Sequence, residues 1–318
     1  MRTFLQRTVA GGGALGLLLG VILIGSALAD EGPSGPQAAT SEPTAPEPIA
    51  TAPSQPAVAA APVKSAFNLF NPTPNADLRS FDTDRPTKAN IPYTVDAGHF
   101  QYETDLVVYG SSNGDGVRTQ AWTVVDPTLK LGLTNTIDAE LQVTPYESVR
   151  TETAGAAADA SGLGDTYARL KINLLGDDGG PAAVALLPYI KLPTARAALG
   201  NGRVEGGVIL PVSFSAPGGF TVIVMPEGDY FKDTTGAGYH GAFDFLVNVS
   251  HPLDKKWTFY TEVFTTQSFQ AGDKPIYTLD EALTFALTPT LQLDFGGNFS
   301  LNDAALRVQL YTGLSQRF

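Results

Sequence analysis

The chain has 318 residues, a formal net charge of -12, 43% hydrophobic residues and 16% charged residues. The excess of acidic residues argues against a nucleic-acid partner, because nucleic acids bind basic surfaces. The sequence contains no cysteine, which excludes disulfide bonds, thiol catalysis and cysteine-ligated metals.

Residues 1–29 have the pattern of a secretory signal peptide. Arg2 and Arg7 precede a short apolar run at residues 15–24, and residues 27–29 supply small side chains at the expected cleavage site. The apolar run is short for a membrane-spanning helix. We therefore expect export through the inner membrane to the bacterial outer membrane, which a mature chain without such a helix would cross as strands.

Residues 30–64 are rich in proline and alanine and contain no aromatic residue. A segment that lacks aromatic residues and hydrophobic periodicity cannot bury a core, which predicts a disordered linker. A featureless spacer and a tether near the peptidoglycan are both compatible with this composition.

Residues 65–94 combine a few apolar anchors with the charged residues Asp84 and Arg85. Because this segment precedes the first predicted strand, we expect it at the periplasmic mouth of a barrel. It would then serve either as a solvated lead-in or as a plug that folds into the lumen. In a plug, the two charges would need partners such as Arg169 or Glu140, since an unpaired buried charge is costly.

Turn signals divide residues 95–318 into segments that show strand-like alternation of apolar and polar residues, clearest at 137–146, 165–175 and 291–301. An even number of such strands, here about 12, is typical of closed antiparallel transmembrane barrels. The predicted strands are 95–109, 117–133, 137–146, 165–175, 183–193, 204–215, 220–227, 240–251, 257–269, 275–287, 291–301 and 305–318.

The last predicted strand ends on Phe318 without a proline or tail to protect its edge. An exposed edge strand invites pairing, and closure into a barrel removes the edge. The ending resembles the closing strand of bacterial outer-membrane barrels, where a terminal phenylalanine is read by the barrel-assembly machinery. We therefore expect Phe318 to be an assembly signal and outer-membrane lipid to surround the barrel.

Most connections between the predicted strands alternate in length, as expected for long external loops and short periplasmic turns, although the last two external connections are short. A soluble sandwich has no reason to sort its loops in this way. The long connections are 147–164, 194–203 and 228–239, and the short ones are 134–136, 216–219 and 288–290.

The polar strand faces supply the candidate lumen residues. Paired charges would fill a narrow barrel as an ion-pair network, whereas the same residues could also line a polar channel. We expect Asp138 and Glu140 to face the neighbouring strand with Arg169 and Lys171, and Arg307 to meet carboxylates on both sides. The candidates are His99, Glu103, Asp105, Asp138, Glu140, Arg169, Lys171, Asp294 and Arg307.

The sequence predicts no catalytic, metal or cofactor site. His99 lies on the first predicted strand, and His240 and His251 lie at the two ends of the predicted strand 240–251, without metal-ligand spacing. The sequence also has no nucleophile elbow, and its glycine pairs do not lie between a strand and a helix as phosphate loops require.

Four segments resemble a family of outer-membrane transporters named for the meta-pathway of phenol degradation. They are Thr-Asp-Arg-Pro at 83–86, Pro-x-Thr-Val at 92–95, Gly-x-x-Gln-x-Glu at 98–103 and Gly-Leu-Ser-x-Arg-Phe at 313–318. The resemblance covers roughly residues 80–318. It implies a barrel and a channel, and it implies no catalytic residues.

The sequence thus favours a channel-like barrel for small solutes and no enzyme activity. If the family name is informative, the solutes are aromatic or otherwise hydrophobic. Two other classes stay open, namely a structural or adhesive barrel without transport and a membrane-embedded enzyme that modifies lipids. Conductance across a planar bilayer separates the first class from the other two.

Overall fold

The computed structural model describes residues 64–318 except residue 115. The predicted signal peptide at 1–29 and almost all of the linker at 30–64 therefore lie outside the described residues. Two short 3-10 helices, η1 (Lys64–Ala66) and η2 (Asn75–Asp77), precede the strands. Among the described residues, no helix is both long and apolar enough to cross a membrane.

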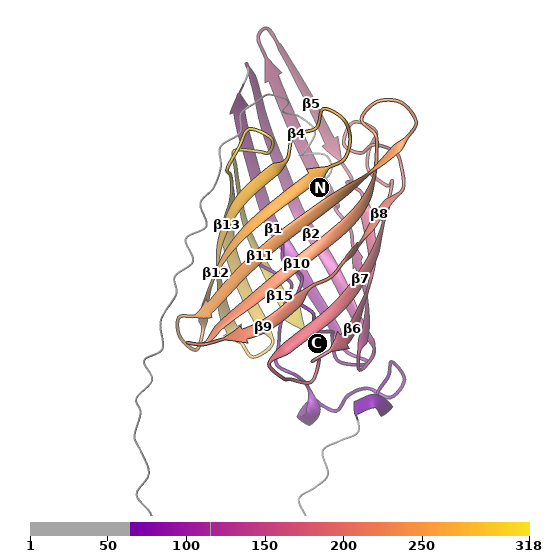
Figure 1. Cartoon of the computed structure of the whole chain (residues 1–318), viewed down its shortest axis with the longest axis vertical. Helices are drawn as coiled ribbons and strands as arrows, with labels where there is room; N and C mark the ends of the chain where they lie inside the picture. Colours follow the sequence, from indigo (N-terminus) through magenta and orange to yellow (C-terminus); the bar gives the residue numbers. More distant parts are fainter. Residues whose placement is uncertain (1–63, 115) are drawn as a thin grey trace, which may run out of the picture. The chain divides into compact units, whose positions relative to one another are not determined.

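The strands form one antiparallel sheet that closes on itself, because β1 pairs with both β2 and β15 (Figure 1). The strands are β1 (Phe100–Gly114), β2 (Val117–Thr134), β3 (Ile137–Gln142), β4 (Tyr146–Thr153), β5 (Ala156–Gly162), β6 (Thr166–Leu175), β7 (Ala182–Leu192), β8 (Glu205–Ile209), β9 (Val212–Ala216), β10 (Phe220–Lys232), β11 (Tyr239–Pro252), β12 (Trp257–Ser268), β13 (Ile276–Thr288), β14 (Leu291–Ser300) and β15 (Val308–Arg317).

The fifteen segments make a barrel of twelve strands, which confirms the predicted fold class. Three barrel strands are interrupted. β3 and β4 are two parts of one barrel strand, because both pair with β2. β6 and β5 are likewise two parts of the next strand, with β6 paired to β3 and β5 paired to β4. β8 and β9 both pair with β10. The last interruption falls at Pro211, which has no amide hydrogen to donate to a ladder.

The first predicted strand, 95–109, is displaced, since β1 begins only at Phe100. Gly98 forms a turn there, with a positive φ of 77° and its amide donating to the carbonyl of Gly132 (2.8 Å). This left-handed backbone conformation suits glycine and ends the preceding segment. Val95 is therefore buried at the barrel base instead of standing in the ladder.

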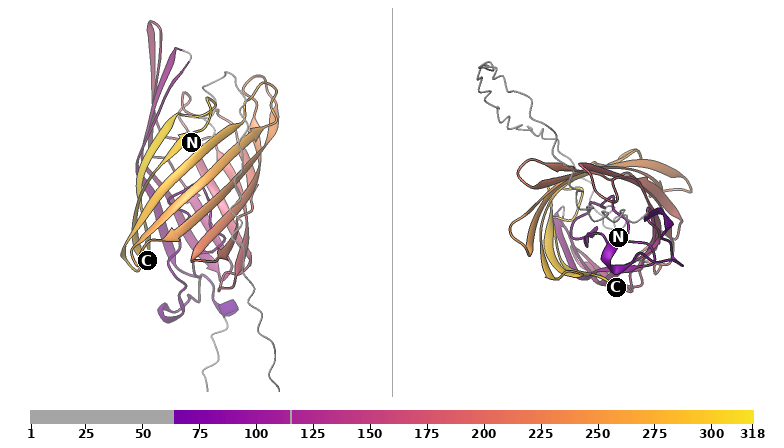
Figure 2. Two further views of the ribbon diagram at one scale, coloured as in Figure 1. Left: turned by 60° about the vertical axis from the view of Figure 1, so that its left-hand side comes forward. Right: turned by 90° about the horizontal axis from the view of Figure 1, so that it is seen from below.

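The predicted loop at 147–164 is wrong, because these residues form the hairpin of β4 and β5. Alanine and threonine side chains are sufficient to form this hairpin, because backbone hydrogen bonds hold the two strands together. Gly155 adopts the positive φ of 88° that the turn requires. The hairpin extends beyond the rest of the barrel rim (Figure 2). β10 also extends into the predicted loop at 228–239, as far as Lys232.

A bulge in β1 and β2 reverses which residues face the lumen. The register moves from Asp105 opposite Asp126 to Val107 opposite Val124, so one residue on each strand is left out of the ladder. The residue left out of β2, Val125, has a φ of 56°, which is costly for a β-branched side chain. The alternation along β2 therefore changes phase at this point.

The barrel is apolar outside and charged inside. Val263 and Phe243 on the outer face are 46% and 40% exposed, whereas Lys130 and Asp280 on the inner face are 2% and 0% exposed. A soluble protein has the opposite distribution, because exposed apolar area is unfavourable in water. An apolar outer belt around a polar interior is the pattern of a transmembrane barrel.

Glu281 is a charged residue on the otherwise apolar outer face of the barrel. Its neighbours in β13, Asp280 and Ala282, are buried on the inner face, so the alternation of the strand turns Glu281 outward. The hydroxyl of Thr261 on β12 donates to its carboxylate (2.8 Å).

We predict that Val263→Arg blocks insertion of the barrel, because arginine on the lipid face costs about 2–4 kcal/mol near the bilayer midplane. The measurement is the amount of heat-modifiable, folded protein in outer-membrane fractions. Val263→Leu controls for the loss of valine, and Gln309→Arg places the same charge beside a lumen cavity. Equal folded amounts for all three variants would contradict a lipid-facing belt.

Candidate functional site

Residues 79–96 lie inside the barrel, and we call them the lumen segment (Figure 2). Backbone amides of the segment donate to carboxylates on the wall. The amides of Asp84 and Arg85 donate to Glu103 on β1 (3.4 and 3.1 Å), and the amides of Lys88 and Ala89 donate to Glu262 on β12 (3.2 and 3.0 Å). The segment is thus held by strands on different sides of the lumen.

Asp84 is the acidic centre of the lumen segment. Its carboxylate lies 2.5 Å from the Nζ of Lys130 on β2 and 2.9 Å from the Nζ of Lys171 on β6. The same two lysines contact wall carboxylates, with Glu103 2.5 Å from Lys130 and Glu140 3.2 Å from Lys171. Burial alone would raise the pKa of Asp84, but the charges of Lys130 and Lys171 outweigh burial and hold this pKa well below its usual range.

Arg85 points to the opposite part of the wall. Its guanidinium donates to Asp294 on β14 through two nitrogens (2.6 and 2.9 Å) and lies 2.8 Å from Asp105 on β1. The ring of Tyr311 on β15 lies 5.8 Å from its central carbon. A Cβ on Gly313 would lie 2.3 Å from a guanidinium nitrogen, so only glycine leaves space for this side chain.

Lys88 and Ala89 fasten the segment to a third region of the wall. The ammonium of Lys88 contacts Asp280 and donates to the hydroxyl of Thr278 (3.2 Å), both on β13. Ala89 belongs to a buried apolar cluster, which gives the segment a contact that does not depend on charge. Apart from Ala89, the cluster consists of Ala185, Leu187, Ile209, Ile223, Met225, Leu246 and Phe264.

Arg79 anchors the segment at the barrel end where the chain terminates. Its guanidinium lies 2.9 Å from Asp178 and 3.4 Å from Asp177, both in the connection between β6 and β7. Burial would raise the pKa of Asp178, but hydrogen bonds from Lys64, Asn135 and Arg79 together lower it to about 2. This end of the segment is therefore also held by charge.

Two cavities lie on either side of the lumen segment. One has a volume of about 330 Å³ and is lined by residues 84–90, and it extends to the connection between β14 and β15. The other has a volume of about 600 Å³, is lined by residues 79–83, 91 and 93–95, and extends to the connection between β6 and β7. Because these connections lie at opposite barrel ends, the segment separates the two cavities along the lumen.

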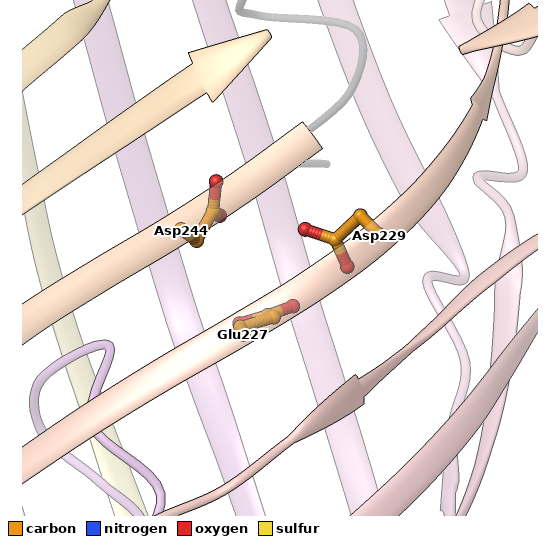
Figure 3. Close-up of side chains that lie close together, drawn as sticks. All are labelled: Glu227, Asp229 and Asp244. Atoms are coloured by element: carbon orange, nitrogen blue, oxygen red, sulfur yellow. The ribbon is translucent and has the colours of Figure 1, made fainter. Parts of the chain in front are cut away.

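Three carboxylates come together on β10 and β11, with oxygen atoms within 4.8 Å of one another (Figure 3). Glu227 and Asp244 are direct partners in the ladder and line the 330 Å³ cavity, and Asp229 accepts a hydrogen bond from the hydroxyl of Tyr189 (2.5 Å). Oxygen ligands of this kind suit hard cations. Acidic residues alone do not define an ion site, so we assign no metal here.

Six of the predicted lumen candidates contact the lumen segment or the residues paired with it, five of them through the ion-pair networks around Asp84 and Arg85. Glu103, Glu140 and Lys171 surround Asp84, and Asp105 and Asp294 surround Arg85. Asp138 is fully buried and accepts the amide hydrogen of Val95 in the lumen segment (2.9 Å). Asp84 pairs with Lys130 and Lys171 instead of the predicted Arg169. Arg85 pairs with Asp105 and Asp294 instead of the predicted Glu140.

The other three candidates lie apart from these networks. Arg169 faces the 330 Å³ cavity, where it donates to Gln142 (2.7 Å). His99 precedes β1 at the barrel base, within hydrogen-bond distance of the carbonyl of Thr73 (2.8 Å). Arg307 is exposed in the connection before β15. Its predicted position beside Asp294 is wrong, because the register places Gly313 there.

Phe318, the predicted assembly signal, closes the seam of the barrel. Its amide donates to the carbonyl of Phe100 (2.9 Å), and the two rings lie 5.9 Å apart. Its side chain is 64% exposed. The side chain of Phe318 can therefore contact molecules outside the barrel, while its backbone pairs with the first strand.

Sequence reasoning missed Lys130, Lys88 and Arg79. The bulge in β2 hides the position of Lys130, because the alternation is out of phase on its two sides. Lys88 and Arg79 stand in a segment without periodicity, so only their charge next to apolar and proline residues could have drawn attention. The sequence also did not show which residue of the acidic pair Asp280-Glu281 faces the lumen, since either residue could have been the inner one.

A family model described as "Putative MetA-pathway of phenol degradation" matches residues 83–318. A comparison with curated proteins finds no match. The family match begins inside the lumen segment and continues to Phe318. It therefore includes Asp84 and Arg85 as well as the whole barrel.

Solved structures with a similar fold are outer-membrane barrels. The COG4313 outer membrane channel from Pseudomonas putida F1 is 16% identical with a TM-score of 0.45, and the alignment covers 69% of this chain and 93% of that one. The NanC porin is 12% identical with a TM-score of 0.43, covering 68% and 98%. The Ralstonia pickettii toluene transporter TbuX is 9% identical with a TM-score of 0.37, covering 69% and 88%. Similarity this low carries no functional argument.

We predict that Lys130→Met destabilises the barrel by about 3–5 kcal/mol, because it leaves buried carboxylates without their cation. The measurement is the midpoint of urea unfolding in detergent. As a control, Arg150→Ala removes exposed ion pairs of the β4–β5 hairpin, and such pairs contribute at most about 1 kcal/mol. Equal midpoint shifts for the two variants would contradict a structural role for the buried network.

We predict a pH-dependent stability difference between the wild type and Asp84→Asn. The pKa of Asp84 lies below its unfolded value of about 3.9, so its contribution is complete above that pH and is lost as the pH falls towards the folded pKa. Melting temperatures should therefore differ at pH 7 and converge below about pH 4. Asp159→Asn, an exposed carboxylate, is the control. A difference that persists unchanged in acid would exclude an ionised Asp84.

Proposed function

The chain belongs to the family described as "Putative MetA-pathway of phenol degradation", and from this premise we propose that it is an outer-membrane channel for small solutes. In this proposal residues 1–29 direct export, and Phe318 directs insertion by the barrel-assembly machinery. The lumen segment closes the channel until it moves.

The observation that supports this proposal most directly is the pair of cavities. A barrel that served only as a scaffold or an adhesin could fill its lumen with wall side chains. Here the wall leaves about 330 Å³ and about 600 Å³ of space, and a segment from outside the barrel strands separates them. A segment placed between two compartments is the arrangement that a gated channel requires.

The lining of the smaller cavity favours amphipathic solutes. Phe264 and Ile209 present apolar surface, and Glu227 and Asp244 present hydrogen-bond acceptors to the same space. A small ring with a hydroxyl group satisfies both kinds of surface, because the ring buries apolar area and the hydroxyl donates to a carboxylate. We therefore propose phenol-like compounds as the solute class.

The arrangement of the charges gives no reason to assign an enzymatic role. The lysines at the centre of the lumen, Lys130 and Lys171, are each surrounded by carboxylates of the wall and the lumen segment. The charged groups of such a network restrain one another and favour the position of the lumen segment that closes the channel. Their proposed role is to hold the segment in place.

We predict that cross-linking the lumen segment to the wall holds the channel closed. The side chains of Thr87 and Asn248 are 3.0 Å apart, and the chain has no native cysteine. A Thr87→Cys/Asn248→Cys protein joined by a short, cleavable thiol linker should show only the lowest conductance level in a planar bilayer. Cleavage of the linker should restore the opening events of the wild type.

A matched control joins two wall strands without touching the segment. Asn298 on β14 and Gln309 on β15 are 2.6 Å apart, so an Asn298→Cys/Gln309→Cys protein receives the same linker and should keep its openings. Openings that continue in the cross-linked Thr87/Asn248 protein would show that the segment does not gate. A folded wild type without any conductance would favour the structural or adhesive barrel.

A further inference from the structure

The wall around Arg85 has the features of a ligand site. Three strands contribute to it, with Asp105 from β1, Asp294 from β14 and Tyr311 with Gly313 from β15. Asp294 accepts two hydrogen bonds from one guanidinium, which is the forked geometry that a carboxylate offers to arginine.

The site is shaped for a flat cation. Gly313 leaves the space in which the guanidinium lies, since a Cβ would approach its central carbon to 2.5 Å. The aromatic ring of Tyr311 adds a cation–π contact at 5.8 Å. An ammonium ion is a compact point charge and would use neither the fork nor the flat space as well.

The occupant of the site belongs to the segment that separates the two cavities. Arg85 thus belongs to the lumen segment, while the residues that bind it belong to the wall. Asp105 and Tyr311 also line the 330 Å³ cavity. A solute in that cavity therefore lies next to the site.

We propose that Asp105, Asp294, Tyr311 and Gly313 form a binding site for the guanidinium or amidinium group of a second solute, distinct from the phenol-like compounds, and that Arg85 occupies this site as a competing, tethered ligand. The part of this proposal that concerns opening rests on the proposed channel function. A bound solute group replaces Arg85 at the wall, which removes one of the charge contacts that hold the lumen segment. The binding site itself is independent of transport.

Removing the tethered ligand exposes the site to a free one. In the full-length Arg85→Ala protein, methylguanidinium should raise the melting temperature in a saturable manner, because a ligand that binds only the folded state stabilises it. Methylammonium, which has the same charge but no fork, should bind at least about tenfold more weakly. In the wild type the same shift should need at least about tenfold more methylguanidinium, since Arg85 competes for the site.

A second substitution tests whether the wall residues form the site. Arg85→Ala/Asp294→Asn should weaken the apparent affinity for methylguanidinium at least about tenfold, because it removes the charge of the bidentate partner. Arg85→Ala/Gln309→Ala, which alters the same cavity without removing a proposed site residue, should not weaken it. If Arg85→Ala folds poorly, refolding yield is measured instead, and methylguanidinium should raise this yield more than methylammonium does.

The outcomes separate this proposal from the channel function. Equal effects of the two cations, or an undiminished effect after Asp294→Asn, would overturn the guanidinium site even if the protein conducts. A saturable, Asp294-dependent effect in a protein that never conducts would support the site and refute the channel. When the protein does conduct, methylguanidinium in the millimolar range should raise the opening frequency of the wild type, and methylammonium should not.

Discussion

The inner wall of this barrel carries buried carboxylates, and cations from a segment outside the barrel strands complete their pairing. Arg85 reaches Asp105 and Asp294, and Lys88 reaches Asp280. A buried carboxylate without a cation or hydrogen-bond donors would be expensive, so the wall and the lumen segment depend on each other. The position of the segment follows from this dependence more than from any shape of its own, because it has no regular secondary structure.

The lumen segment is held by two kinds of contact with different physical behaviour. On one side, Asp84 and Arg85 form charge pairs that are directional and respond to protonation or to competing ions. On the other side, Ala89 packs into an apolar cluster that responds to neither. An element held in this mixed way can lose one set of contacts and keep the other, which suits a partial displacement within the lumen.

The fold could be predicted from the alternation of residues, but the partners of the charges could not. Alternation states which face of a strand a residue occupies, and Asp138, Glu140 and Lys171, which it assigns to the inner face, are buried. It does not state the register, so Arg307 was assigned to Asp294 although Gly313 lies opposite. The bulge at Val125 and the unpatterned lumen segment carry no periodic signal, and the cations that complete the site come from these places.

The contacts of Arg85 also span the seam at which the barrel closes. Asp105 belongs to the first strand, whereas Asp294 and Gly313 belong to the last two, so a single side chain bridges the seam where the cylinder closes. A segment that ends up enclosed enters most readily before the terminal strands meet. The segment would then act as an internal template, drawing the two edges together by opposite charge as the cylinder forms around it. Errors at Arg85 would accordingly appear first in the yield of closed barrels and only afterwards in what passes through them.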